Sequence, residues 1–167
     1  MLYLKEANFE DIEKEYEYIT NLPENENGYL NANYGVSREE FESRVLPGFI
    51  NASKGIGLPP GRVPGTQYFL WNDDVIVGLF RFRHMLNDVL REGAGHIGFG
   101  IRKEYRGKGY ATKGLALLLE IAKKEVLEDE IYMSVDKTNP ASLKVMLNNG
   151  AYIHHENEEE YFTRIKL

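Results

Sequence analysis

The feature that most constrains the fold is a glycine-rich turn between two apolar segments. The turn covers residues 106–111 and reads RGKGYA; an apolar run over 97–101 precedes it, and a longer apolar run over 114–122 follows it. This order predicts a strand, a tight turn and a helix. Backbone N–H groups at a helix N-terminus, together with the helix dipole, create a site for an anion, most often a phosphate. The turn therefore predicts a phosphate-binding cradle.

The charge around this turn favours a small ligand. The chain carries a formal net charge of −6, yet basic residues gather here, namely Arg102, Lys103, Arg106, Lys108 and Lys113. A confined basic cluster on an acidic protein favours a small anion, whereas nucleic acid usually requires a broad basic face. No nucleic acid partner is therefore expected. A solvated basic turn that only caps a helix remains the alternative.

A family resemblance rests on two motifs. The pattern Arg-x-x-Gly-x-Ala at 106–111, between an apolar strand and an apolar helix, resembles motif A of the GNAT acyl-CoA-dependent N-acyltransferases. The segment 139–146, with the sequence NPASLKVM, leads to NGAY at 149–152 and is similar to motif B, in which an Asn begins a short helix and a glycine ends it. The two motifs follow each other in the family's order and spacing.

The resemblance implies an α+β fold, in which helices flank a mixed, mostly antiparallel sheet within a single domain over residues 1–167. It also implies an N-acetyltransferase that moves an acetyl group from acetyl-CoA, its co-substrate, to an amine of a small molecule, peptide or protein. Direct attack by the amine is expected rather than an acyl-enzyme, because the chain has no cysteine and no serine in a nucleophile-and-base arrangement.

The resemblance further assigns residues to acetyl-CoA. The backbone of 99–101 is implied to pair with the acetyl and pantetheine part, the amides of 107–112 to hold the pyrophosphate, and Asn139 to contact the pantetheine arm. The implied cofactor-binding residues are Phe99, Gly100, Ile101, Arg106, Gly107, Lys108, Gly109, Tyr110, Ala111, Thr112, Asn139 and Ser142. The small Gly98 and Gly100 suit a strand whose ladder opens beside the acetyl group.

Three residues are candidates for the general base that removes a proton from the amine. His96 has an intrinsic pKa suited to the role and begins the strand over 97–101. Glu92 lies just upstream, and Asp136 ends the neighbouring strand. The sequence does not decide between them, and a histidine at a strand end is also commonly a hydrogen-bonded structural residue.

One position departs from the family pattern. Many members carry a tyrosine in the motif B helix that protonates the leaving thiolate, and the aligned residue here is Met146. A thiol with a pKa of about 8.5 is a tolerable leaving group without such help. The rival function is a non-catalytic module that binds CoA or a partner on the same fold.

The acceptor side is expected in the segments around the sheet. The candidates are His84, Asn87 and the loop over 55–65, because loops on a rigid sheet commonly set substrate choice. Ordinary turn and helix-cap hydrogen bonds are the alternative for both side chains.

The composition and the lengths of the apolar runs exclude several other kinds of site and of location. The absence of cysteine excludes disulfides and thiolate metal sites, and no metal cluster is visible in the sequence. The N-terminus lacks the apolar core of a signal peptide, and no run is long enough to span a bilayer, so a cytoplasmic protein without a membrane partner is expected. A homodimer is compatible with the sequence. The GxGxxG match at 93–98 is not a dinucleotide site, because its strand follows the glycines instead of preceding them.

Periodicity and turn residues predict the other elements. Strands are expected at 2–4, 68–71, 75–82, 97–101, 131–135, 152–154 and 161–165, and helices at 9–20, 37–52, 112–126 and from 140 to the glycine at 150. Residues 21–34 are expected to form a loop. Ser37 and Glu40 form a capping-box pattern that begins the second helix.

Overall fold

The computed structural model describes all 167 residues. The strands are β1 (Leu2–Glu6), β2 (Asn25–Glu26), β3 (Tyr29–Leu30), β4 (Gly65–Asn72), β5 (Val75–Arg83), β6 (Ile97–Ile101), β7 (Glu130–Asp136), β8 (Tyr152–Glu156) and β9 (Glu160–Lys166). The helices are α1 (Ile12–Asn21), α2 (Arg38–Glu40), α3 (Leu46–Ser53), α4 (Asp88–Glu92), α5 (Tyr110–Glu125) and α6 (Pro140–Asn148). A π-helical segment, Phe41–Val45, joins α2 to α3, and a 3-10 turn spans Lys103–Tyr105.

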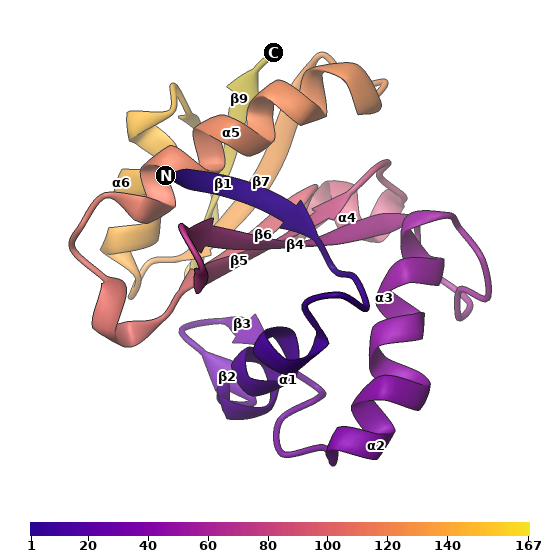
Figure 1. Ribbon diagram of the computed structural model, residues 1–167. Coiled ribbons are helices and arrows are strands. Elements are labelled where there is room, and N and C mark those ends of the chain that lie inside the picture. Colours follow the sequence, from indigo (N-terminus) through magenta and orange to yellow (C-terminus); the bar gives the residue numbers. More distant parts are fainter.

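The strands form two main antiparallel sheets and one small hairpin. The larger sheet has the order β1-β4-β5-β6, the smaller has the order β7-β9-β8, and β2 pairs with β3. Helices cover both faces of the larger sheet: in Figure 1, α5 lies above it, and α1, α2 and α3 lie below it. The predicted α+β architecture, with a mostly antiparallel sheet flanked by helices, is confirmed.

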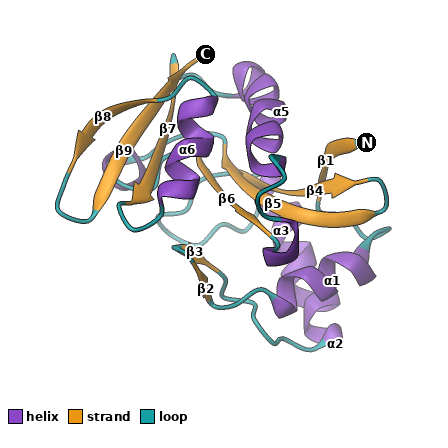
Figure 2. Cartoon of the chain, turned by 90° about the vertical axis from the view of Figure 1, so that its left-hand side faces the viewer, coloured by secondary structure: helices purple, strands orange, loops and turns teal.

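The two main sheets separate between β6 and β7. β6 pairs only with β5, and β7 pairs only with β9, apart from an isolated bridge between Gly95 and Met133 at one end. Figure 2 shows β6 and β7 diverging from each other, with the β2–β3 hairpin below β6. The predicted opening of the ladder beside residues 99–101 is therefore present.

The alternation of the antiparallel ladder decides which backbone groups of β6 are free. Arg102 N–H donates to Val77 C=O at 2.9 Å. Because hydrogen-bonded positions alternate along an antiparallel strand, Gly100 and Gly98 also bond to β5. The N–H and C=O of Phe99 and Ile101 therefore point away from β5, toward the gap between the sheets.

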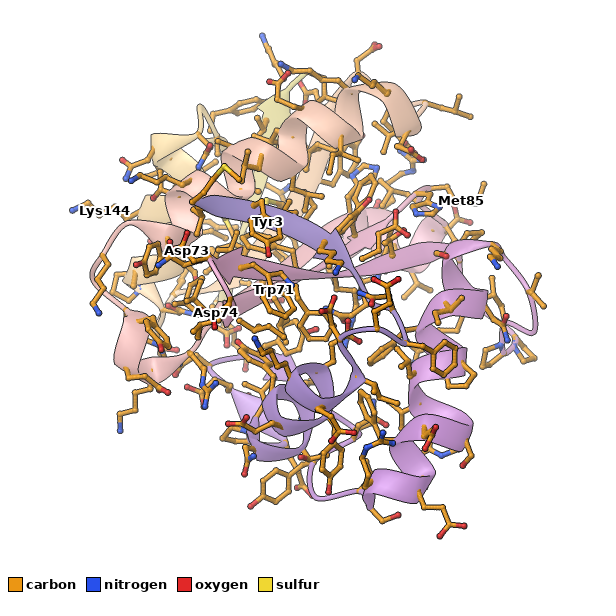
Figure 3. The ribbon with its side chains drawn as sticks, viewed as in Figure 1. Tyr3, Trp71, Asp73, Asp74, Met85 and Lys144 are labelled. Carbon is orange, nitrogen blue, oxygen red and sulfur yellow. The ribbon has the colours of Figure 1, made fainter.

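The larger sheet carries a hydrophobic core on each face. Alternate residues of β4 point to opposite faces, so Leu70 joins the core under α5, whereas Phe69 and Trp71 join the core with α1 and α3. Tyr3 of β1 stacks on Trp71 with ring centroids 6.3 Å apart, and both are labelled in Figure 3.

α5 approaches the larger sheet closely at Gly114. A Cβ atom there would lie 2.7 Å from the Phe80 ring and 3.0 Å from Leu70 Cδ2, so the helix reaches this position only with glycine. The close contact fixes where the N-terminus of α5 lies relative to β6.

Three predicted elements differ in detail. The first helix begins at Ile12 instead of residue 9. The second begins at Arg38 with Ser37 as its N-cap, whose hydroxyl accepts from Glu40 N–H at 3.1 Å, but Phe41–Val45 is π-helical. The expected loop over 21–34 contains the β2–β3 hairpin. Its turn, Asn27-Gly28, has φ angles of 52° and 91°, which suit a two-residue hairpin connection.

Candidate active site

The glycine turn before α5 presents a series of free amides. Gly107 and Gly109 have φ angles of 76° and 77°, a region that favours glycine, and Gly109 is the N-cap of α5 without a side-chain cap. None of the N–H groups of residues 107–112 donates to a backbone carbonyl. A Cβ at Gly107 or Gly109 would meet no atom within 4 Å. The turn thus has the open, donor-rich form that a phosphate requires.

A groove with a volume of about 490 Å³ runs from this turn along β6 and α6. We call it the α5 groove. Eleven of the twelve residues that the sequence assigned to acetyl-CoA line it, namely Phe99, Gly100, Ile101, Arg106, Gly107, Gly109, Tyr110, Ala111, Thr112, Asn139 and Ser142. Lys108 does not line it, and its ammonium group lies over the Tyr105 ring, 5.2 Å from the centroid. Lys144 of α6 also borders the groove and appears at the edge of the molecule in Figure 3.

Two side chains fix the walls of the α5 groove. Arg106 donates from Nε to the Ile101 carbonyl at 2.9 Å and pairs with Glu26 of the hairpin, so it ties the turn to both β6 and β2. Asn139 caps α6, because its Oδ1 accepts from Ser142 N–H at 3.2 Å, and its Nδ2 donates to the Asn27 carbonyl at 3.3 Å. Both contacts hold the hairpin against the groove.

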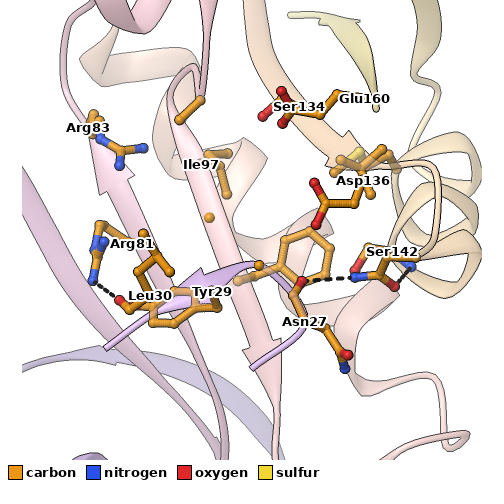
Figure 4. A pocket seen from close by; sticks show the side chains of 17 residues that line it. Asn27, Tyr29, Leu30, Arg81, Arg83, Ile97, Ser134, Asp136, Ser142 and Glu160 are labelled. Carbon is orange, nitrogen blue, oxygen red and sulfur yellow. Dashed lines mark hydrogen bonds between the residues drawn. The ribbon is translucent and has the colours of Figure 1, made fainter. Parts of the chain in front are cut away.

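A second cavity adjoins the α5 groove on the hairpin side. Its volume is about 210 Å³, and we call it the side pocket. Figure 4 shows Arg81 and Arg83 of β5 along one side, with Asp136 and Glu160 along the other. The two cavities share four lining residues, namely Asn27, Phe99, Asn139 and Ser142. A reaction between a ligand in the groove and one in the pocket would take place beside these four.

The model of the acetyltransferase (GNAT) domain family matches residues 62–152, more than half of the chain. The chain belongs to the GNAT acetyltransferase family. It is therefore an enzyme of acetyl transfer, as the two motifs implied.

Solved structures of GNAT enzymes share the fold over almost the whole chain. The RimL ribosomal L7/L12 alpha-N-protein acetyltransferase in complex with coenzyme A has a TM-score of 0.70 and 14% identity, with 99% of this chain and 94% of that chain covered. Ribosomal-protein-S5-alanine acetyltransferase from Vibrio fischeri has a TM-score of 0.70 and 17% identity, with 99% and 92% covered. Spermidine N-acetyltransferase from Vibrio cholerae, in complex with CoA and spermine, has a TM-score of 0.66 and 16% identity, with 99% and 95% covered. No curated protein matched the sequence.

Of the three candidate bases, only Asp136 lines the side pocket. It is the last residue of β7, and its Oδ2 lies 3.1 Å from where a Cβ on Gly28 would stand, so the carboxylate lies directly against the hairpin turn. Glu92 ends α4, is exposed and lines neither cavity.

His96 has a structural position. Its side chain is fully buried; Nδ1 accepts from Tyr132 N–H at 2.9 Å, so Nε2 carries the proton that it donates to Glu128 at 3.2 Å. Its own N–H donates to the Tyr132 carbonyl at 2.7 Å. Burial lowers the pKa of His96 despite the Glu128 carboxylate. Because both nitrogens are used and the ring borders neither cavity, the geometry speaks against His96 as the base; it joins β6 to β7.

The two predicted substrate residues also have structural partners. His84 Nε2 lies 2.7 Å from Thr66 Oγ1. Asn87 caps α4 by accepting from Leu90 N–H at 2.9 Å and donates to the Gly61 carbonyl at 3.0 Å. Neither they nor the loop over 55–65 borders the two cavities.

The β2–β3 hairpin, and not the loop over 55–65, borders the side pocket. The residues Asn27, Gly28, Tyr29 and Leu30 all line the side pocket, yet neither of the two motifs includes them. The signal was present, since Asn-Gly between short extended segments is a strong indicator of a tight hairpin.

Met146 occupies the position expected from motif B. Its side chain is buried, borders the side pocket and accepts a hydrogen bond from the Thr163 hydroxyl to Sδ at 3.4 Å. The thioether has no proton to give, so the family's tyrosine acid has no counterpart at this position.

No set of three or more His, Asp or Glu side chains is arranged to hold a metal ion. None of the helices combines the length and apolar character needed to cross a bilayer.

Proposed function

We propose that this GNAT enzyme transfers the acetyl group of acetyl-CoA, held in the α5 groove, to a primary amine held in the side pocket. The observation that carries the proposal is the junction of the two cavities at Phe99, on the free edge of β6. A thioester in the groove and an amine in the pocket would meet there.

The pyrophosphate of acetyl-CoA fits the turn before α5. The amides of 107–112 have no backbone acceptor, and the helix dipole favours an anion at this end. Arg106 already bonds Ile101 and Glu26, so it supports the turn, and the exposed Lys144 is the free cation on the opposite wall.

The free N–H of Phe99 is the proposed oxyanion donor. It points into the gap between β6 and β7 without a partner strand, at the junction of the two cavities. A preorganised backbone donor of this kind contributes about 2.7–4 kcal/mol when it faces developing negative charge. Holding both reactants side by side contributes further, up to about 7–11 kcal/mol in the best-oriented cases.

Asp136 is the proposed base. The carboxylate takes a proton from the substrate ammonium, directly or through one water, and the neutral amine then attacks the thioester carbon. The new C–N bond forms, the C–S bond breaks, and the second amine proton is lost to solvent. The CoA thiolate leaves without a side-chain acid, because Met146 cannot donate a proton, and takes its proton from water.

The proposal is tested by thiol release from acetyl-CoA with a panel of primary amines and of peptides with free N-termini. Asp136→Asn should lower kcat by about 10²- to 10⁴-fold, the usual contribution of a positioned base, with little change in the Kd for CoA. Glu92→Gln is the matched control, since that carboxylate is exposed and lines neither cavity.

Two results would contradict the proposed function. Full activity in Asp136→Asn would remove Asp136 as the base. Tight CoA binding without thiol release across the whole panel would favour the rival function, a CoA-binding module without catalysis.

A further inference from the structure

The side pocket carries opposite charges on its two sides. Arg81 and Arg83 come from β5, and Asp136 and Glu160 come from neighbouring positions of β7 and β9, where the two carboxylates are register partners. Figure 4 shows the two guanidinium groups across the cavity from the two carboxylates.

The two arginines share one face of β5. They are two residues apart and flank Phe82, which is fully buried in the core on the other face. Gly98 of β6 lies opposite Arg81 in the ladder and has no side chain, so the Tyr29 ring packs beside it and Arg81 lies over that ring. The strand therefore presents both cations to the same cavity.

The contacts that Arg81 and Arg83 make within the protein occupy few of their hydrogen-bond donors. Arg81 donates to the Leu30 carbonyl at 3.4 Å and lies over the Tyr29 ring at 4.9 Å, and Arg83 donates to the Gly95 carbonyl at 3.2 Å. A guanidinium has five N–H donors. Neither arginine has a carboxylate within 4.0 Å. Most of their donors thus remain available to a ligand.

Arg83 is also held in an unfavourable environment. Burial, and next to it the positive charge of Arg81, lower the pKa of its guanidinium to about 10. A partly buried cation without a counter-ion is destabilising, and a bound anion removes that cost. The opposite wall fits an ammonium group, because Asp136 and Glu160 have no cationic partner within 4.0 Å either.

We propose that the acceptor is a small amine that also carries an oxyanion, a carboxylate or a phosphate, with the oxyanion on Arg81 and Arg83 and the amine beside Asp136 and Glu160. This inference rests on the proposed function of the side pocket. The volume of about 210 Å³ suits a compact molecule.

The test compares matched amines in the thiol-release assay. The carboxylate pair is 4-aminobutanoate and 4-aminobutanamide, the phosphate pair is 2-aminoethyl phosphate and 2-aminoethanol, and 1,4-diaminobutane represents a dication. All carry an ammonium group, so the member of a pair with a carboxylate or phosphate is called the anionic member, and the one with an uncharged group in its place is called the neutral member. We expect kcat/KM to favour the anionic member of at least one pair by about 10- to 100-fold, the value of one or two charge-assisted hydrogen bonds. The pair with the larger ratio identifies the oxyanion.

Variants then assign the preference to the two arginines. Arg83→Gln, and separately Arg81→Gln, should reduce the anionic-to-neutral ratio of kcat/KM toward one, whereas Arg44→Gln, an exposed arginine on the π-helical segment, should not alter it. The Kd for CoA by calorimetry should be the same in all three variants. Higher kcat/KM for 1,4-diaminobutane or the neutral amines in the unmodified enzyme would overturn the inference.

A measurement without turnover separates this inference from the proposed function. The Nε–H resonance of Arg83 is followed by NMR while each probe is titrated into the CoA-bound protein. We expect a shift with the anionic probes and none with the neutral ones. Equal responses, or none with any probe, would overturn the anion site even if acetylation of neutral amines upholds the proposed function; failure of CoA binding itself would instead count against the proposed function.

Discussion

Glu15 is an ionisable side chain whose position disfavours its charged form. It is fully buried on α1; Oε1 accepts from Asn8 N–H at 3.0 Å, whereas Oε2 is buried without a partner. Burial raises the pKa of this carboxyl to about 8. The folded protein therefore keeps Glu15 protonated at neutral pH, while the unfolded chain ionises it near pH 4.5.

This difference predicts a loss of stability as the pH rises. The contribution of Glu15 is fully present below pH 4.5 and falls by about 1.4 kcal/mol per pH unit until the pH reaches the folded pKa. Glu15→Gln removes this dependence. The free energy of unfolding of Glu15→Gln minus that of the unmodified protein should therefore be more positive at pH 8 than at pH 5, by about 2–4 kcal/mol. Urea unfolding at both pH values measures it, with the exposed Glu39→Gln as control. Parallel pH profiles for Glu15→Gln and the unmodified protein would contradict the assignment.

The choice of the general base depends on contacts that the sequence does not record. Asp136 and His96 were both candidate bases, and their residue types alone do not separate them. The difference comes from the partners Tyr132 and Glu128, which are distant in sequence and occupy both nitrogens of the His96 ring. No local pattern records that pairing, whereas the β-strand period correctly puts Asp136 at the end of its strand.

At the scale of elements, local signals predicted most of the fold. The apolar runs and the glycine turn give β6 and α5, and Asn139 before Pro140 gives the start of α6. The β2–β3 hairpin was missed because each of its strands has only two residues, too few for a periodicity. Its position against Asn139 and Arg106 depends on contacts with residues about 80 and 112 positions away along the chain.

The close approach of α5 to the sheet predicts opposite effects at two helical glycines. Gly114→Ala should lower the free energy of unfolding by about 1–3 kcal/mol, because the new methyl group overlaps the Phe80 ring. Gly48→Ala in α3 should raise it by about 0.5–1 kcal/mol, since a Cβ there meets nothing within 4 Å and alanine favours the helix. Urea unfolding compares the two, and equal effects would contradict the packing.

At the scale of the whole molecule, the site exists because two sheets meet without pairing. The larger sheet provides β6 with its free edge, the smaller sheet provides Asp136, and α5 and α6 bring the phosphate turn and Asn139 to the same gap. The family resemblance implied this arrangement, but the chain's own periodicities do not, since the order of strands β7, β9 and β8 depends on long-range pairing. The charges of the side pocket likewise come from three strands.

The most direct test of the account is a calorimetric titration of CoA into three proteins. Gly109→Asp places a carboxylate among the amides before α5, and Gly57→Asp makes the same change at a glycine with a φ of 66° and no atom within 4 Å, in a loop remote from both cavities. The loss of several charge-assisted hydrogen bonds predicts that Gly109→Asp weakens CoA binding at least ~100-fold, while Gly57→Asp binds CoA as the unmodified protein does. Equal affinity in all three proteins would contradict the claim that the main-chain amides of this turn hold the pyrophosphate.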